Sequence, residues 1–246
     1  AYPQVKSMFS ERYERQVLLP EVGEAGQRKL LASSALVVGC GGLASTLLYC
    51  LCGMGVGRIG FCDGDTVSLS NLNRQFLHGV TDVGRKKTAS AYEKLSAFAP
   101  ELALEPYDVS LTDENARRII SRYDVVLLAV DSITSRRVVN RACIAENIPL
   151  IDGGINGLNG TLLTVRPHET ACLACLFGEA RPPAGKIPSF APVVSALSAM
   201  QAQTAANLLL GLPNPTDGRL LLFDGSSLTT DFIPISRHTG CPVCGR

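Results

Sequence analysis

The sequence lacks two features that would point to a membrane or to nucleic acid. No apolar run approaches the about 20 residues that a helix needs to cross a bilayer, and residues 1–16 lack the apolar core of a signal peptide. The formal net charge is only +1, so the chain carries no global basic field for nucleic acid or an anionic surface. We therefore expect a cytoplasmic protein with no membrane and no nucleic-acid partner.

The composition suits a folded globular protein. Hydrophobic residues make up 46% and charged residues 18% of the 246 residues, which supplies a sizeable core and argues against disorder. No internal repeat or low-complexity segment is evident. We expect a single domain over residues 1–246.

The nine cysteines fall into two groups. Four form two Cys-x-x-Cys pairs, Cys172/Cys175 and Cys241/Cys244. In a reducing compartment such pairs favour a metal over disulfides, and four thiolates fill a tetrahedral structural zinc site with no open position. A redox Cys-x-x-Cys motif is the alternative, although it would not need a second pair. The other five lie in apolar settings that make a thiol inert: Cys40, Cys50, Cys52, Cys62 and Cys143.

Through its first part the chain alternates short apolar runs with helix-like stretches. The runs predict strands at 35–38, 58–62, 102–107, 124–130 and 148–151. The stretches between them predict helices at about 42–54, 83–98, 112–121 and 132–146. This alternation is typical of a Rossmann-like α/β fold, a doubly wound and mostly parallel sheet with right-handed crossovers.

The remaining part changes character. Strands are expected at 161–165, 220–223 and 229–235, with an Ala-rich apolar helix at 193–210. We interpret these elements as a C-terminal antiparallel extension of the same domain. Residues 181–192 contain four prolines, which predicts a mobile loop at 178–191.

A glycine-rich turn follows the first predicted strand. Residues 39–44, Gly-Cys-Gly-Gly-Leu-Ala, resemble the G-x-G-x-x-G/A pattern, in which glycines let the backbone approach phosphate at a helix N-terminus. Asp63 ends the next strand, where an acid can hold a ribose hydroxyl. The turn indicates a nucleotide without separating NAD from ATP, and a purely structural glycine turn is the alternative.

The segment after Asp63 favours a triphosphate. It continues through Asp65, Asn71, Arg74 and Gln75, and Lys87 follows downstream. Nicotinamide binding needs no arginine and lysine here, whereas a triphosphate needs cations to neutralise its oxygens and the leaving pyrophosphate. A solvated surface role is plausible for Lys87 alone and fits poorly for Arg74.

Asp131 ends the apolar strand at 125–130. Ligands of open α/β sheets bind at the carboxyl ends of the strands, so this carboxylate could bind the magnesium that bridges phosphates. The alternative is that Asp131 caps the next helix. The two roles are compatible.

Taken together, these motifs carry a family resemblance. The segment Asp63-Gly-Asp-Thr-Val-Ser-Leu-Ser-Asn-Leu-Asn-Arg-Gln, the glycine turn, the opening Arg12-Tyr-Glu-Arg-Gln and the paired Cys-x-x-Cys motifs resemble the MoeB/ThiF/HesA family. These proteins are bacterial relatives of ubiquitin-activating enzymes. The resemblance extends from Arg12 to Cys244, nearly the whole chain.

The resemblance implies a homodimeric adenylyltransferase. Such an enzyme uses Mg-ATP to adenylate the C-terminal Gly-Gly carboxylate of a ubiquitin-like sulfur-carrier protein (ThiS/MoaD-like) and releases pyrophosphate. The implied nucleotide-binding part is 12–166, and the zinc-bearing C-terminal elaboration is 167–246. By motif, the resemblance implies a phosphate turn at Gly39, Gly41 and Gly42 and a ribose-binding acid, Asp63, with Asp65 beside it. It implies a phosphate-binding set of Asn71, Arg74, Gln75 and Lys87. It also implies that Asp131 binds magnesium and that Arg15 reaches the partner subunit's nucleotide.

The chain departs from the family pattern in three places. The third glycine of the turn is replaced by Ala44, which tightens helix–strand packing. Asp131 is followed by Ser132 where relatives commonly have asparagine. Relatives often carry a cysteine in the proline-rich loop where this chain has Ala184, so a thioester or persulfide step on that loop is not expected.

Three alternatives stay open at this point. The enzyme could adenylate a different carboxylate, either a small molecule or a peptide C-terminus. It could be an NAD(P)-dependent oxidoreductase, although no hydride-transfer constellation is evident. It could be a non-catalytic scaffold that retains the fold. The pathway served, whether thiamine, molybdopterin or another sulfur-containing product, does not follow from the sequence.

Overall fold

The computed structural model describes residues 11–178 and 185–245 of the chain. Within these residues the strands form one eight-stranded mixed sheet in the order β3-β2-β1-β4-β5-β6-β7-β8. The first five strands of that order are parallel, and β5 through β8 pair antiparallel. In chain order the strands are β1 (Ser34–Val38), β2 (Arg58–Cys62), β3 (Ala103–Tyr107), β4 (Val125–Leu128), β5 (Leu150–Asn156), β6 (Asn159–Val165), β7 (Arg219–Asp224) and β8 (Thr229–Pro234).

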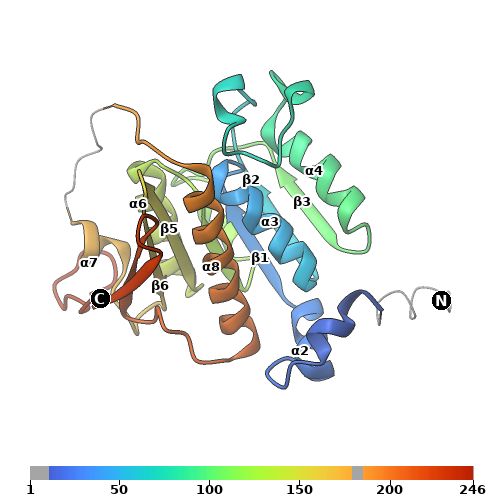
Figure 1. Cartoon of the computed structure of the whole chain (residues 1–246). Coiled ribbons are helices and arrows are strands. Elements are labelled where there is room, and N and C mark those ends of the chain that lie inside the picture. The colour runs from blue at the N-terminus through green and yellow to red at the C-terminus, as the bar shows by residue number, and fades with distance from the viewer. Residues whose placement is uncertain (1–10, 179–184, 246) are drawn as a thin grey trace.

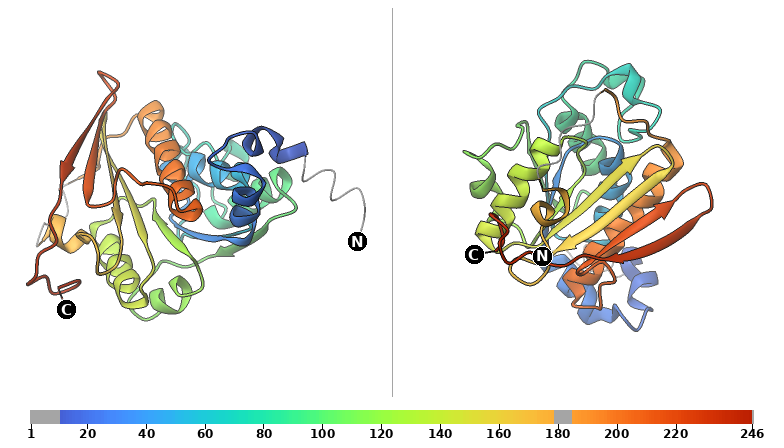
Figure 2. Two further views of the ribbon diagram at one scale, coloured as in Figure 1. Left: turned by 90° about the horizontal axis from the view of Figure 1, so that it is seen from below. Right: turned by 90° about the vertical axis from the view of Figure 1, so that its left-hand side faces the viewer.

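Helices cover both faces of this sheet, and Figure 2 shows the resulting three layers. One apolar core packs α3 (Gly42–Met54), α4 (Lys87–Phe98) and α8 (Ala191–Leu210) on one face. The other core packs α5 (Ala116–Ile120), α6 (Ile133–Glu146) and α7 (Leu173–Phe177) on the opposite face. The central strands β1 and β4 are therefore buried on both faces, which is why they read as continuous apolar runs. The α/β fold class and its antiparallel extension are confirmed.

The helix α8 corrects one expectation. Among the described residues it alone is long and apolar enough, by length and composition, to cross a membrane, so the sequence does contain a run of about 20 residues of that kind. However, 56% of its most apolar stretch is buried inside the protein. It packs against α3, as Figure 1 shows, and against the sheet, so it is a core helix.

Several predicted boundaries shift. The helix expected from 83 begins at Lys87, because a 3-10 turn (η2, Val80–Asp82) and Gly84, with φ of 87°, come first. The helix expected at 112–121 is the short α5, and the strand expected at 148–151 is the longer β5. A further 3-10 turn (η1, Leu69–Asn71), α2 (Gly23–Ala32), α7 and the helical residues 11–17 were not predicted. Residues 179–184 of the loop expected at 178–191, Ala184 included, lie outside the described residues, and α8 begins at the loop's last residue.

Candidate active site

The glycine turn joins β1 to α3 at the carboxyl edge of the sheet. Gly39 has a φ of 103°, and a Cβ on it would lie 2.6 Å from the carbonyl oxygen of Ala129. Glycine is therefore required there both by conformation and by the approach of the chain that follows β4. Gly42 opens α3, and Arg74 and Val194 pack against its backbone.

Asp63, directly after β2, is tied to this turn. Its Oδ2 accepts a hydrogen bond of 2.8 Å from the backbone N–H of Cys40, and its Oδ1 accepts one of 2.8 Å from the N–H of Asp65. The Nζ of Lys87, at the start of α4, lies 3.6 Å from Asp63 Oδ2 and 3.0 Å from Asp65 Oδ2. Lys87 is 7% exposed, so a nearly buried cation stands between two carboxylates at the rim of the turn.

The loop after Asp65 brings the amide and guanidinium groups to the same edge. Asn71 ends the 3-10 turn η1, and the Nη1 of Arg74 donates to the carbonyl of Ser70 at 3.2 Å and to Oδ1 of Asn73 at 3.0 Å. Gln75 is 5% exposed, and its Oε1 has no hydrogen-bond partner among the described residues. A buried amide oxygen without a partner is costly, which marks Gln75 as a group able to accept from a bound ligand.

Asp131 follows β4 and is exposed at the same edge. The N-cap of α6 is the next residue, Ser132, whose Oγ accepts from the N–H of Ser135 at 3.2 Å. The capping role considered for Asp131 therefore belongs to Ser132, and the carboxylate of Asp131 is left for another use.

Two buried side chains hold β4 and β5 together where they separate. The last paired residues are Leu128 and Asp152. The Nε2 of Gln201 donates to the carbonyls of Leu128 and Ile151 at 2.8 and 3.0 Å. Arg136 forms an ion pair with Asp152 and donates to the backbone carbonyls of Val130 and Gly153. Burial lowers the pKa of Arg136 to about 10, while the charge of Asp131 opposes that shift.

Ten of the predicted site residues line one cavity of about 880 Å³. They are Gly39, Gly41, Gly42, Asp63, Asp65, Asn71, Arg74, Gln75, Lys87 and Asp131. The carboxyl ends of β1, β2 and β4 bring them together, as expected for a parallel sheet. A cavity of this size suits a ligand as large as a nucleotide.

Arg15 is not among the residues that line this cavity. It is exposed on the helical residues 11–17. Two neighbours anchor that helix: the hydroxyl of Tyr13 donates to Glu101 at 3.2 Å, and the Nε2 of Gln16 donates to Gln27 at 2.8 Å. The helix is thereby fixed with Arg15 facing solvent.

Part of the cavity wall was not predicted from the sequence. The hairpin of β5 and β6 contributes Gly154, Asn156, Asn159 and Thr161. The available signal was the run at 152–160, Asp-Gly-Gly-Ile-Asn-Gly-Leu-Asn-Gly, whose polar and glycine content is unusual for a strand. The cavity thus continues from the glycine turn across β5 and β6.

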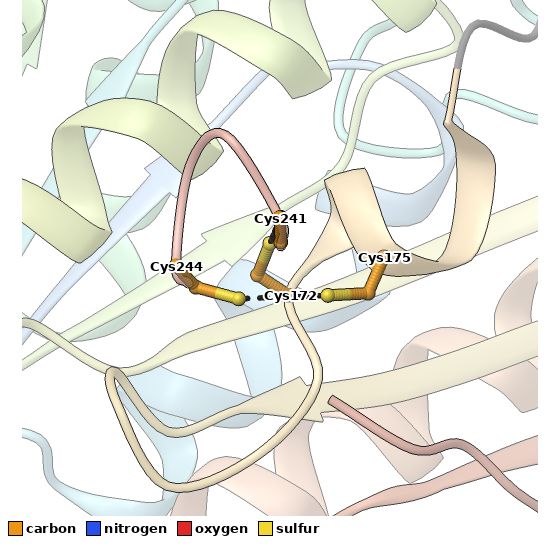
Figure 3. A group of neighbouring side chains, drawn as sticks. All are labelled: Cys172, Cys175, Cys241 and Cys244. Carbon is orange, nitrogen blue, oxygen red and sulfur yellow. Dashed lines mark hydrogen bonds between the residues drawn. The ribbon is translucent and has the colours of Figure 1, made fainter. Parts of the chain in front are cut away.

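The four paired cysteines lie outside the cavity lining and converge on one another, as Figure 3 shows. Their sulfur atoms all lie within 4.8 Å of one another, with Cys172–Cys241 at 3.8 Å and Cys175–Cys244 at 3.5 Å. All four are free thiols. A zinc–sulfur bond of about 2.3 Å places tetrahedral sulfurs about 3.8 Å apart, so this donor set fits zinc.

The surroundings act on the four thiols in two directions. Burial raises the pKa of Cys172, Cys175 and Cys244. Burial also acts to raise the pKa of Cys241, but backbone N–H groups of Cys244 and Val243 outweigh it and bring that pKa to about 7. The N–H of His238 points at the sulfur of Cys175 at 3.5 Å. Hydrogen bonds to sulfur stabilise the deprotonated form that a metal requires.

The other five cysteines lie in the interior. Cys40, Cys52, Cys62 and Cys143 are buried, and Cys50 is half-buried. Burial raises the pKa of each of them, to about 12 for Cys52 and Cys62. These thiols are protonated near neutral pH and are poor nucleophiles.

Known proteins resemble this chain in sequence and in fold. The chain is 37% identical over 246 residues to the sulfur carrier protein adenylyltransferase of Thermus thermophilus, covering 96% of this chain and 90% of that protein. It is 38% identical over 241 residues to the sulfur carrier protein ThiS adenylyltransferase of Escherichia coli, covering 95% and 94%. The crystal structure of Escherichia coli MccB with ATP shares the fold, with a TM-score of 0.84 at 23% identity over 96% of this chain and 75% of that one.

The match to a family is equally extensive. Residues 13–243 match the model of the ThiF family, and they contain the glycine turn, the segment after Asp63, Asp131 and three of the four clustered cysteines, with Cys244 one residue beyond the match. The chain belongs to the ThiF family.

Proposed function

We propose that this protein is an adenylyltransferase that uses Mg-ATP to activate the C-terminal Gly-Gly carboxylate of a ubiquitin-like sulfur-carrier protein, releasing pyrophosphate. Two relatives that match it over nearly their whole length are named for the adenylation of sulfur carriers. The observation that carries the proposal is the single cavity in which glycines, two cations, two amides and three carboxylates of the family motifs meet.

The reaction sets clear demands on such a cavity. A carboxylate oxygen of the carrier attacks the α-phosphorus of ATP, an oxygen–phosphorus bond forms, and the bond to the leaving pyrophosphate breaks. Neither reactant needs to lose a proton, because the carboxylate is already ionised at neutral pH. Catalysis therefore depends on alignment and on neutralising charge rather than on a protein base.

Different residues of the cavity meet these demands. We assign the backbone of Gly39, Gly41 and Gly42 to the phosphates and the carboxylate of Asp63 to the ribose, with Asp65 orienting the lysine beside it. We assign the triphosphate and the departing pyrophosphate to the side-chain N–H groups of Asn71 and Gln75 and to the cations Arg74 and Lys87. Their N–H donors and positive charges complement the phosphate oxygens, which are negatively charged acceptors.

Asp131 is the residue assigned to magnesium. A carboxylate is the ligand type that this ion takes together with substrate phosphates, and Asp131 is exposed at the cavity with no capping duty. When bound, magnesium would offset negative charge on the phosphates. The four-cysteine cluster would hold zinc in a purely structural role, because four thiolates leave no open position.

We further propose a homodimer in which Arg15 contacts the partner subunit's nucleotide. Arg15 lies outside the cavity of its own chain, on a helix whose other side is anchored. Leu18 and Leu19, directly after that helix, are 72% and 51% exposed, which suits a surface that a second subunit covers. We also propose that the protein acts as a single domain over 1–246 in the cytoplasm.

One pair of assays tests the function against its main competitor. The purified protein is supplied with ATP, magnesium, labelled pyrophosphate and a ThiS-like carrier, and in parallel with NAD(P)H and a panel of carbonyl substrates. The proposal requires carrier-dependent exchange of label into ATP. Oxidation of NAD(P)H without any exchange of label would contradict the proposal and identify the protein as an oxidoreductase.

A further inference from the structure

His78 is a buried histidine that the assigned roles leave unused. It follows the loop of Arg74 and Gln75 and is only 5% exposed. Its Nε2 lies 2.9 Å from the carbonyl oxygen of Cys40, in the glycine turn, and its Nδ1 lies 2.9 Å from the Oγ of Ser90, on α4. One ring therefore connects the turn to the helix that begins with Lys87.

The partners determine where the ring proton sits. A carbonyl oxygen only accepts, so Nε2 carries the hydrogen and donates it to Cys40. The ammonium of Lys94 donates to Ser90 Oγ at 2.9 Å and to the buried carboxylate of Asp82 at 2.6 Å. The Ser90 hydroxyl also interacts with the carboxylate of Asp82. It lies 2.9 Å from Nδ1 and donates to the ring when the imidazole is neutral, so a chain of hydrogen bonds runs from Lys94 through Ser90 and His78 to Cys40.

The charges around the ring agree with a neutral imidazole. Burial lowers the pKa of His78, and the cations Lys94 and Lys87 act in the same direction, against the hydrogen bond to Cys40 and the charge of Asp82. A neutral ring with its proton on Nε2 is the form that this chain of hydrogen bonds requires.

The bond to Cys40 has a consequence for the next residue. The carbonyl of Cys40 and the N–H of Gly41 belong to one trans peptide unit, in which they point in opposite directions. Because His78 holds the carbonyl on the buried side, the N–H of Gly41 points away from the ring, on the side where Gly41 lines the cavity.

The neighbouring peptide units are held by other groups. The N–H of Cys40 donates to Asp63 at 2.8 Å, and the carbonyl of Gly41 accepts from the N–H of Ser45 at 3.0 Å within α3. His78 is thus the side chain that orients the unit between them. Among the described residues, the N–H of Gly41 has no protein acceptor.

We infer that His78 is a positioning residue: by donating Nε2–H to the carbonyl of Cys40, it aims the N–H of Gly41 at the phosphates of the bound nucleotide. This inference rests on the proposed function, since it requires a phosphate-bearing ligand in the cavity. It concerns phosphate contacts alone, because the proposed function assigns the ribose to Asp63 and the phosphates to the turn.

A pair of polar substitutions separates this role from simple packing. In His78→Gln the side-chain nitrogen reaches about as far as Nε2, so the bond to Cys40 is kept. In His78→Asn it reaches only about as far as Nδ1, so the bond to Cys40 is lost. Ser90→Ala removes the other bond of the ring and serves as the control. Each protein is titrated calorimetrically with Mg-ATP and with adenosine, and its thermal unfolding is recorded.

The inference predicts a selective effect. His78→Gln and Ser90→Ala bind ATP within about threefold of the wild type, whereas His78→Asn binds ATP about tenfold more weakly, the size of one lost charge-assisted hydrogen bond. All bind adenosine like the wild type. If His78→Asn does not fold, His78→Met, which fills the space without a donor, takes its place with the same expectation.

Two results would overturn the inference. One is equal ATP affinity in the Gln and Asn variants, and the other is a parallel loss of ATP and adenosine binding, which would indicate a packing role only. A wild type that binds adenosine no more weakly than ATP would instead contradict the proposed function, and the inference with it.

Discussion

The carboxylate of Asp63 accepts a 2.8 Å hydrogen bond from the backbone N–H of Cys40, which ties the end of β2 to the glycine turn. Asp63 therefore has a structural duty in addition to its proposed contact with ribose. We predict that Asp63→Ala loses about 1–2 kcal/mol of unfolding free energy, because a buried N–H is left unpaired. ATP affinity should fall at least about tenfold, since turn and ribose contact are both lost. Urea unfolding and calorimetric titration measure the two effects, and Asp231→Ala, which removes an exposed acid that does not line the cavity, is the control.

The second prediction separates Asp131 from Ser132. Asp131→Ala should abolish ATP–pyrophosphate exchange with an unchanged melting temperature, because Asp131 is exposed and caps nothing. Ser132→Ala should cost about 1 kcal/mol of stability through the lost N-cap while exchange is retained. Full exchange activity in Asp131→Ala, measured across a magnesium titration, would refute the assignment of this residue to the metal.

The third prediction concerns zinc. Metal analysis of protein purified without chelators should find one zinc per chain. Cys241→Ser and Cys172→Ser should each destabilise the C-terminal region by several kcal/mol, because metal binding is coupled to folding. Cys50→Ser, at a half-buried thiol outside the cluster, is the matched control and should retain the metal. Absence of zinc from such preparations would overturn the site.

The fourth prediction places Arg15 in the neighbouring site. Arg15→Ala and Asp131→Ala should each be inactive as homodimers. Dissociated, mixed and re-associated, they should recover part of the activity, because one site of each heterodimer then has both residues intact. Heterodimers that are proven by mass spectrometry and still show no exchange would place Arg15 in its own subunit's site or outside any site.

The sequence predicted most of the sheet, and with it the glycine turn, Asp63 and Asp131, for one physical reason. In a parallel sheet the strands are uniformly apolar and end at a common edge, so polar residues that follow such runs, as Asp63 and Asp131 do, gather there. The family motif then added Asp65, Asn71, Arg74, Gln75 and Lys87 and implied a role for each residue of the set.

What was missed depends on pairings that are distant along the chain. His78 has no local signature, because its partners Cys40 and Ser90 lie 38 and 12 residues away. Thr161 reaches the cavity only because β6 folds back on β5. The start of α4 was misplaced because the 3-10 turn η2 precedes it, held by Asp82, which accepts from the N–H of Gly79 at 2.7 Å. Periodicity does not report such hydrogen bonds.

The most direct test of the central claim is mass-spectrometric detection of the activated carrier. The enzyme is incubated with Mg-ATP and a ThiS-like carrier that ends in a free Gly-Gly carboxylate, and in parallel with the same carrier lacking its last glycine. We predict a carrier acyl-adenylate and one equivalent of pyrophosphate with the intact carrier only. ATP turnover without an adenylated carrier, or equal adenylation of both carriers, would contradict the account.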